Sequence, residues 1–113
     1  MKQEKMNILW MNADSITAEE MLFKYVVNAP RQGWWEDVLV IIWGSSANLV
    51  AADPKFQDLV REGIEEGVRF SACKSCADNL GASETLRTLG VEVVYWGERL
   101  SNLLKAEEKL ITI

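Results

Sequence analysis

Five short runs of apolar residues, rich in branched side chains, are separated by stretches in which apolar residues recur at helical spacing. This alternation is typical of βα units, in which the strands of a parallel sheet are followed by helices that pack on them. We therefore predict one α/β domain over residues 1–113 with a mainly parallel five-stranded sheet. Segment 37–43 is apolar almost throughout, which predicts a central strand with both faces covered. The predicted strands are 6–11, 37–43, 68–72, 91–96 and 109–113.

Local signals mark the starts of the predicted helices. Thr17 and Glu20 have the spacing of a capping box, so we predict that the first helix begins near Thr17. Asp53 and Pro54 combine an N-cap acceptor with a proline at the first helical position, which predicts the start of the second helix. Ser75 is the predicted cap of a short third helix. Further helices are predicted over 83–89 and about 98–106.

The strand-to-helix loops are where we expect the chemistry. In a parallel sheet with right-handed crossovers these loops all lie at the carboxyl edge of the sheet, where ligands bind. The third loop contains Cys73 and Cys76, separated by two residues, and these are the candidate catalytic residues. The earlier loops supply polar candidates for ligand binding, but they lack the spacing of a phosphate-binding or dinucleotide-binding loop. These ligand-binding candidates are Asn12, Ser45, Ser46 and Asn48.

A helix start beside the cysteines has a chemical consequence. If Ser75 is the cap, Cys76 is the first helical residue, where unpaired amides and the helix dipole favour thiolate over thiol. Lys74 supports this preference and Asp78 opposes it. Cys73 lies near enough in sequence to form a transient disulfide with Cys76, or to resolve a persulfide formed on it. The alternative is that the cysteines are buried as small apolar side chains.

Composition narrows the classes of function. A net charge of -5, with acidic and basic residues interspersed, provides no basic patch and argues against a nucleic-acid partner. The absence of histidine removes the commonest zinc ligand and the usual base of a serine or cysteine nucleophile, and we predict no metal and no cofactor. The longest apolar run, 38–43, is too short to span a bilayer, and residues 1–5 have no signal-peptide pattern. A cytoplasmic protein without membrane association is therefore expected.

The chain resembles DsrE/DsrF-like proteins in its element order and most specifically in residues 70–81 (FSACKSCADNLG) and 90–94 (GVEVV). The resemblance implies a three-layer α/β/α sandwich and a homo-oligomer, either a trimer or a hexamer. It also implies a cysteine near the end of the third strand that accepts persulfide sulfur from a donor protein and passes it to an acceptor protein. Cys73 or Cys76 would be that carrier, and the predicted helix start favours Cys76.

Three functions are compatible with these features. The first is a sulfur-relay protein that carries a persulfide. The second is a thiol-disulfide oxidoreductase using Cys73 and Cys76, although thioredoxin-like proteins have a later proline, whereas Pro30 and Pro54 both precede the cysteines. The third is a non-catalytic oligomeric binding module in which the cysteines only pack.

Overall fold

The structure is a computed structural model that describes residues 4–113. It contains a five-stranded sheet in the order β4-β3-β2-β1-β5, and every neighbouring pair of strands is parallel. The predicted α/β class and the central position of β2 are confirmed, and the sheet is entirely rather than mainly parallel. The strands are β1 (Lys5–Trp10), β2 (Asp37–Ile42), β3 (Arg69–Cys73), β4 (Glu92–Val94) and β5 (Leu110–Thr112).

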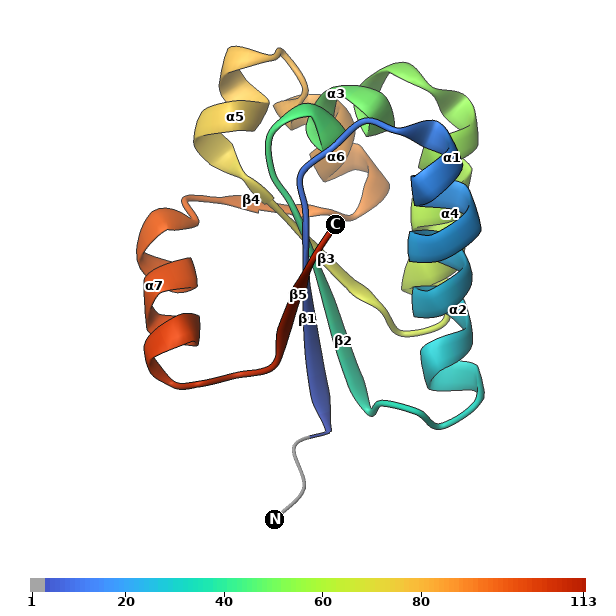
Figure 1. Cartoon of the computed structure of the whole chain (residues 1–113). Coiled ribbons are helices and arrows are strands. Elements are labelled where there is room, and N and C mark those ends of the chain that lie inside the picture. The colour runs from blue at the N-terminus through green and yellow to red at the C-terminus, as the bar shows by residue number, and fades with distance from the viewer. Residues whose placement is uncertain (1–3) are drawn as a thin grey trace.

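Helices flank the sheet and produce three layers, with α2 and α4 on one face and α7 on the other (Figure 1). In residues 4–113 there is no helix with the length and apolar character needed to cross a membrane. The helical segments are α1 (Ser15–Thr17), a π-helical turn η1 (Ala18–Phe23), α2 (Lys24–Arg31), α3 (Ser45–Ala52), α4 (Pro54–Glu65), α5 (Lys74–Asn79), α6 (Ser83–Leu89) and α7 (Gly97–Lys105).

The two faces of the sheet form two apolar clusters of unequal size. Because side chains alternate along a strand, Ile8 and Val40 enter the larger cluster under α2, α4 and α6, whereas Leu9 and Ile41 face α7. We call the smaller group on the second face the α7-side cluster. Its buried members are Leu9, Leu39, Ile41, Cys73, Trp96 and Leu103, with Trp43, Cys76, Val94, Leu100 and Leu110 packed against them.

Two helix starts differ from the predictions and one agrees. The first helix begins at Ser15 rather than near Thr17, because the Asp14 carboxylate accepts the N–H groups of Ile16 at 3.0 Å and Thr17 at 3.3 Å. Asp53 caps α4 as predicted and accepts the N–H of Lys55 at 2.9 Å. The third helix, α5, begins one residue before its predicted cap at Ser75.

Helix α3 was not predicted, because its Gly-Ser-Ser start has the composition of a turn. The strand-to-helix connection after β2 therefore consists of Trp43 and Gly44, and the helix begins at Ser45. Gly44 has φ +72°, and a β-carbon there would lie 3.2 Å from the carbonyl oxygen of Met11. A residue without a side chain is thus required where this connection passes the end of β1.

Candidate functional site

Strand β3 runs directly into α5, and this junction fixes both cysteines. Cys73 is the last residue of β3 and the N-cap of α5, with φ -68° and ψ 116°, and Lys74 is already helical. Cys76 is consequently the third helical residue. The prediction that Ser75 caps the helix and Cys76 begins it was wrong, because cysteine is not among the residues that favour the N-cap and composition gave no reason to place it there.

Both cysteines belong to the α7-side cluster, but they differ in exposure. The Cys73 side chain is only 4% exposed, whereas Cys76 packs against the edge of the cluster and is half-buried. Within residues 4–113 both are free thiols. Solvent and partner molecules therefore reach Cys76 more easily than Cys73.

The charged neighbours of the cysteines are paired with each other. The Lys74 ammonium forms an ion pair with the Asp78 carboxylate one turn later and lies 5.4 Å from the centre of the Tyr95 ring. Hydrogen bonds from Lys74 and from the Ser83 hydroxyl lower the pKa of Asp78, and the same contact with Asp78 raises the pKa of Lys74. The ammonium group of Lys74, which lies between the cysteines in the sequence, is thus paired with the carboxylate of Asp78 on the surface of α5.

An apolar cavity of about 370 Å³ opens at the carboxyl ends of β1 and β2, beside α7. Three of its lining residues, Leu9, Trp43 and Leu100, are also members of the α7-side cluster that contains the cysteines. The carboxyl edge therefore combines a partly exposed thiol with a neighbouring apolar cavity. The lining residues are Leu9, Met11, Trp43, Gly44 and Leu100.

The predicted ligand-binding residues lie at this edge but mostly in α3 rather than in a loop. Ser46 is fully buried, and its hydroxyl donates to the carbonyl of Trp10 at 2.7 Å. The Ser45 hydroxyl donates to the carbonyl of Met11 at 3.1 Å. Asn12, in the connection after β1, accepts the N–H of Asp14 at 3.0 Å. These three side chains hydrogen-bond to backbone groups at the end of β1 and in the connection that follows it.

Asn48 is exposed on α3. Its assignment to ligand binding, and that of Asn12, Ser45 and Ser46, stays a prediction.

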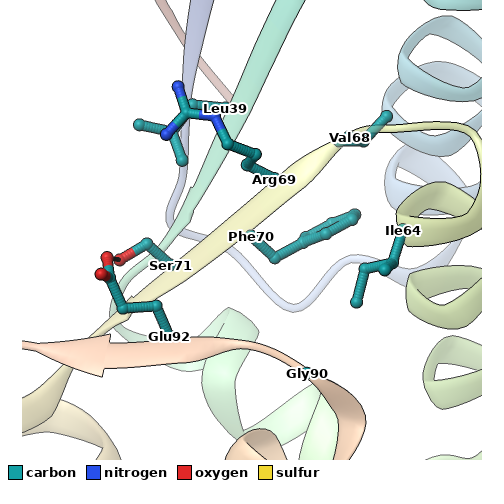
Figure 2. A pocket seen from close by; sticks show the side chains of 8 residues that line it. All are labelled: Leu39, Ile64, Val68, Arg69, Phe70, Ser71, Gly90 and Glu92. Atoms are coloured by element: carbon teal, nitrogen blue, oxygen red, sulfur yellow. Dashed lines mark hydrogen bonds between the residues drawn. The ribbon is translucent and has the colours of Figure 1, made fainter.

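A second cavity, of about 280 Å³, lies near the amino ends of β3 and β4 and was not predicted (Figure 2). Its polar walls are internally paired: the Ser71 hydroxyl donates to Glu92 at 2.8 Å, and Arg69 donates two hydrogen bonds of 2.9 Å to Asp37. It lies at the end of the sheet opposite the cysteines and is not part of the candidate site. The lining residues are Leu39, Ile64, Val68, Arg69, Phe70, Ser71, Gly90 and Glu92.

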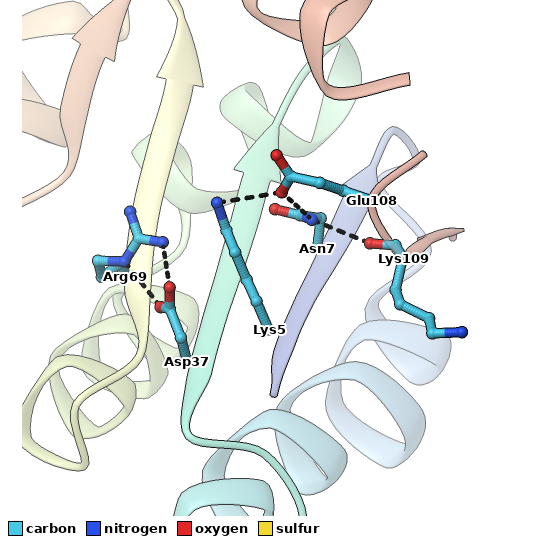
Figure 3. A network of polar contacts seen from close by, with 6 residues as sticks. All are labelled: Lys5, Asn7, Asp37, Arg69, Glu108 and Lys109. Atoms are coloured by element: carbon cyan, nitrogen blue, oxygen red, sulfur yellow. Dashed lines mark hydrogen bonds and ion pairs between the residues drawn. The ribbon is translucent and has the colours of Figure 1, made fainter. Parts of the chain in front are cut away.

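Sequence reasoning also missed Asn7, a fully buried polar residue in the middle of β1. Its amide donates to the carbonyl of Lys109 at 2.9 Å and to Glu108 at 3.2 Å, and Glu108 also pairs with Lys5 at 3.1 Å (Figure 3). Contacts with Lys5 and then Asn7 lower the pKa of Glu108. The only sequence signal was an asparagine inside an apolar strand, and the contacts show that it attaches the segment before β5 to β1.

Among solved structures, a protein from Bacteroides thetaiotaomicron is similar to this chain in both sequence and fold. A conserved protein of unknown function from Bacteroides thetaiotaomicron, BT1422, is 35% identical, with a TM-score of 0.96, over 97% of this chain and 95% of that chain. No protein-family model and no curated protein matches the chain.

Two DsrE-like proteins share the fold at lower identity. YchN from E. coli is 16% identical with a TM-score of 0.70, and the alignment covers 99% of this chain and 100% of YchN. MTH1491, a protein of unknown function from Methanobacterium thermoautotrophicum, is 17% identical with a TM-score of 0.64, over 99% of this chain and 100% of that chain. These two similarities establish the common architecture.

Proposed function

Given that this chain belongs to the family of the Bacteroides thetaiotaomicron protein BT1422 and has the fold of DsrE-like proteins, we propose that it is a sulfur-relay protein. In this proposal Cys76 accepts sulfane sulfur from a donor protein, holds it as a persulfide, and passes it to an acceptor protein. The observation that carries the proposal is a partly exposed free thiol in the first turn of α5, at the carboxyl edge of the sheet.

The chemistry needs a reactive sulfur and a partner that docks on it. The Cys76 thiolate attacks the outer sulfur of a donor persulfide, a new S–S bond forms, and the donor leaves as a thiolate. Transfer to the acceptor is the same displacement in reverse, with the acceptor thiolate attacking the outer sulfur on Cys76. The net result is movement of one sulfur atom between thiols, and the relay needs no cofactor.

Exposure supports Cys76 over Cys73 as the carrier. A displacement requires the attacking and leaving sulfur atoms to approach in line, so the carrier has to be accessible to a protein partner. Cys76 is half-buried and packs against the α7-side cluster, whereas Cys73 is a buried member of that cluster. From the resemblance to DsrE/DsrF-like proteins the proposal takes a homo-oligomer, a trimer or a hexamer, as the working form. It also places the reaction in the cytoplasm, where both thiols would be reduced.

Mass spectrometry of the loaded protein tests the proposal. After incubation with a persulfide donor, we expect the intact mass of Cys73→Ala to rise by one sulfur atom, with the adduct mapping to the Cys76 peptide. Cys76→Ser should gain no sulfur, and the exposed Ser75→Ala change, made in the Cys73→Ala background, should leave the adduct in place. If no variant gains sulfur under conditions that load an authentic carrier, the proposal is wrong.

A thiol-disulfide oxidoreductase is the second candidate, and the observation in its favour is that both thiols pack in one cluster. The two activities are separable, because an oxidoreductase reduces insulin disulfides with a dithiol reductant and has no need of a sulfur donor. Insulin turnover that disappears in both single Cys→Ser variants, together with no sulfur loading, would favour this candidate.

A further inference from the structure

The two cysteines lie at neighbouring positions of one helix start and belong to one apolar cluster. Cys73 is the N-cap of α5 and Cys76 is the third residue of the helix. In a capping box the side chains of the N-cap and the third helical residue each reach the backbone N–H of the other residue, so both lie beside the same first turn, and this spacing places the two cysteine side chains next to each other at the helix start. The structure agrees, since both side chains pack into the α7-side cluster.

Their exposures give the two thiols different access to other molecules. Cys76 can be reached from outside, but Cys73 is 4% exposed and is enclosed by side chains of β2, β4 and α7. The α7-side cluster around Cys73 is otherwise apolar apart from the indole N–H of Trp96, which is engaged by the Ser71 hydroxyl at 2.8 Å. For Cys73, the available sulfur partner is therefore the one on Cys76.

We propose that Cys73 is a resolving cysteine, which discharges the persulfide on Cys76 as sulfide and leaves a Cys73–Cys76 disulfide. This inference rests on the proposed relay function and adds a second outcome to it. The proposal gives the buried Cys73 thiol a chemical role, whereas persulfide transfer through Cys76 alone does not involve Cys73.

The reaction balances as a thiol-disulfide displacement. The Cys73 thiol gives up its proton, and its sulfur attacks the inner sulfur of the Cys76 persulfide. The bond between the two cysteine sulfurs forms, the bond to the outer sulfur breaks, and hydrosulfide leaves with the electron pair. The outer sulfur gains two electrons and each cysteine sulfur loses one. A dithiol reductant of the thioredoxin class then restores both thiols.

The competition between the two outcomes follows from burial. A docked acceptor attacks the outer sulfur, which projects from Cys76, while Cys73 attacks the inner sulfur from within the cluster. A persulfide that meets an acceptor is thus passed on, and one that waits is released as sulfide. The pair prevents a loaded carrier from persisting without a partner.

The test compares sulfide release from loaded protein in the absence of reductant. Wild type, Cys73→Ser, Cys73→Ala, Cys76→Ser and the surface control Ser75→Ala are each reduced, treated with a persulfide donor, and freed of it by gel filtration. Sulfide is then measured over time, and the non-reduced intact mass is recorded. Serine at position 73 keeps a good N-cap residue and alanine keeps an apolar side chain, so at least one of these variants retains the fold.

We expect wild type and Ser75→Ala to release about one sulfide per loaded chain and to end two hydrogens lighter than the reduced protein. Both Cys73 variants should retain the added sulfur atom and release sulfide at least about tenfold more slowly. Cys76→Ser should neither load nor release.

The failures of the two proposals differ. A wild type that retains its added sulfur as long as the Cys73 variants do overturns the resolving role and leaves the relay intact. Failure of the Cys73 variants to load at all, while they remain folded by circular dichroism, overturns Cys76 as the carrier and with it the resolving reaction. Wild-type sulfide release accompanied by a disulfide between two chains also overturns the assignment, because the proposed bond lies within one chain.

Discussion

Ser46 shows how one buried hydroxyl holds the carboxyl edge together. Its oxygen donates to the carbonyl of Trp10 at 2.7 Å and accepts the N–H of Trp43 at 3.2 Å, so it joins the ends of β1 and β2. The residue is fully buried, and its hydroxyl adds a second hydrogen bond to each of two backbone groups that already bond each other, the Trp43 N–H and the Trp10 carbonyl, at 3.1 Å. The position of Trp43, a wall of the apolar cavity, depends on this contact.

We predict that Ser46→Ala lowers the free energy of unfolding by about 1–1.5 kcal/mol, because a fully buried hydroxyl loses its hydrogen bonds, while the Trp10 carbonyl and the Trp43 N–H keep the bond of 3.1 Å between them. Ser45→Ala is the matched control: its hydroxyl bond to Met11 lies at the surface, and we expect a loss below about 1 kcal/mol. Urea denaturation followed by tryptophan fluorescence measures both changes. Equal losses in the two variants would contradict the special position of Ser46.

Glu92 ends a chain of polar contacts that begins inside the α7-side cluster. The Trp96 indole donates to Ser71 at 2.8 Å, the Ser71 hydroxyl donates to Glu92 at 2.8 Å, and Arg99 donates to the same carboxylate oxygen at 2.8 Å. The hydrogen bond from Ser71, and then the contacts with Arg99, lower the pKa of Glu92 below its usual 4.5. The ionised carboxylate is therefore favoured by the folded state.

A pKa lowered on folding stabilises the protein above the unfolded value, and this stability is lost as the pH falls through the folded pKa. Wild type should therefore be more stable than Glu92→Gln near pH 6, by less than about 1 kcal/mol because the pair is exposed. The difference should shrink as the pH falls through the lowered pKa of Glu92. Urea denaturation of both proteins across this range tests the sign, and a difference that grows on acidification would contradict it.

Among the helices, α5 is the one whose start changes the chemistry. Because the helix is short and its capping signals are weak, the prediction placed its cap at Ser75 and its first residue at Cys76, but the structure places its cap at Cys73 and its first residue at Lys74, without an intervening loop. That shift moves Cys76 from the first to the third helical residue and makes Cys73 the N-cap. The pairing of the two thiols across the first turn follows from this register.

Helix α4 packs closely against β3 because residue 63 is glycine. A β-carbon there would lie 2.9 Å from two ring atoms of Phe70, which is buried in the larger cluster. The Phe70 ring is itself stacked on Phe23 at a centroid distance of 6.2 Å and has little room to move. The glycine lowers helix propensity but allows the helix to approach the sheet.

We predict that Gly63→Ala destabilises the protein by about 1–3 kcal/mol, since overpacking of Phe70 outweighs the gain in helix propensity. Gly97→Ala at the start of α7 is the control, because a β-carbon there has open space within residues 4–113. We expect it to be neutral or slightly stabilising. Thermal unfolding of both variants distinguishes them, and a stabilised Gly63→Ala would show that Phe70 relaxes freely.

The two faces of the sheet are covered unequally. Helices α2, α4 and α6 contribute to the larger cluster, while α7 is the helix seen over the other face in residues 4–113 (Figure 1). Partly covered apolar side chains of the α7-side cluster, such as Trp43 and Leu100, border the open cavity. A surface of this kind is typical of proteins that associate.

For the purified protein we predict a mass of three or six chains by light scattering, and an unfolding midpoint that rises with protein concentration. Association between folded chains stabilises the folded state by mass action. The midpoint of unfolding and the measured molecular mass should therefore both fall when the protein is diluted. A single-chain mass at every concentration, with a constant midpoint, would contradict the oligomer.

The pattern of apolar residues along the chain predicted the five strands and a mainly parallel sheet. A uniformly apolar segment such as 37–43 has to be buried by helices on both faces of the sheet, which is typical of parallel sheets. The handedness of crossovers was then sufficient to bring Cys73 and Cys76 to the carboxyl edge. Neither rule specifies which side chains a neighbouring helix covers. The burial of Cys73 and the partial exposure of Cys76 arise from the exact start of α5 after β3 and from the packing of α7 on the sheet. The hydrogen bond of Ser46 to Trp10 arises from the packing of α3 on the end of β1. The packing of α7 and of α3 brings together residues that are distant in sequence, which periodicity along the chain does not specify.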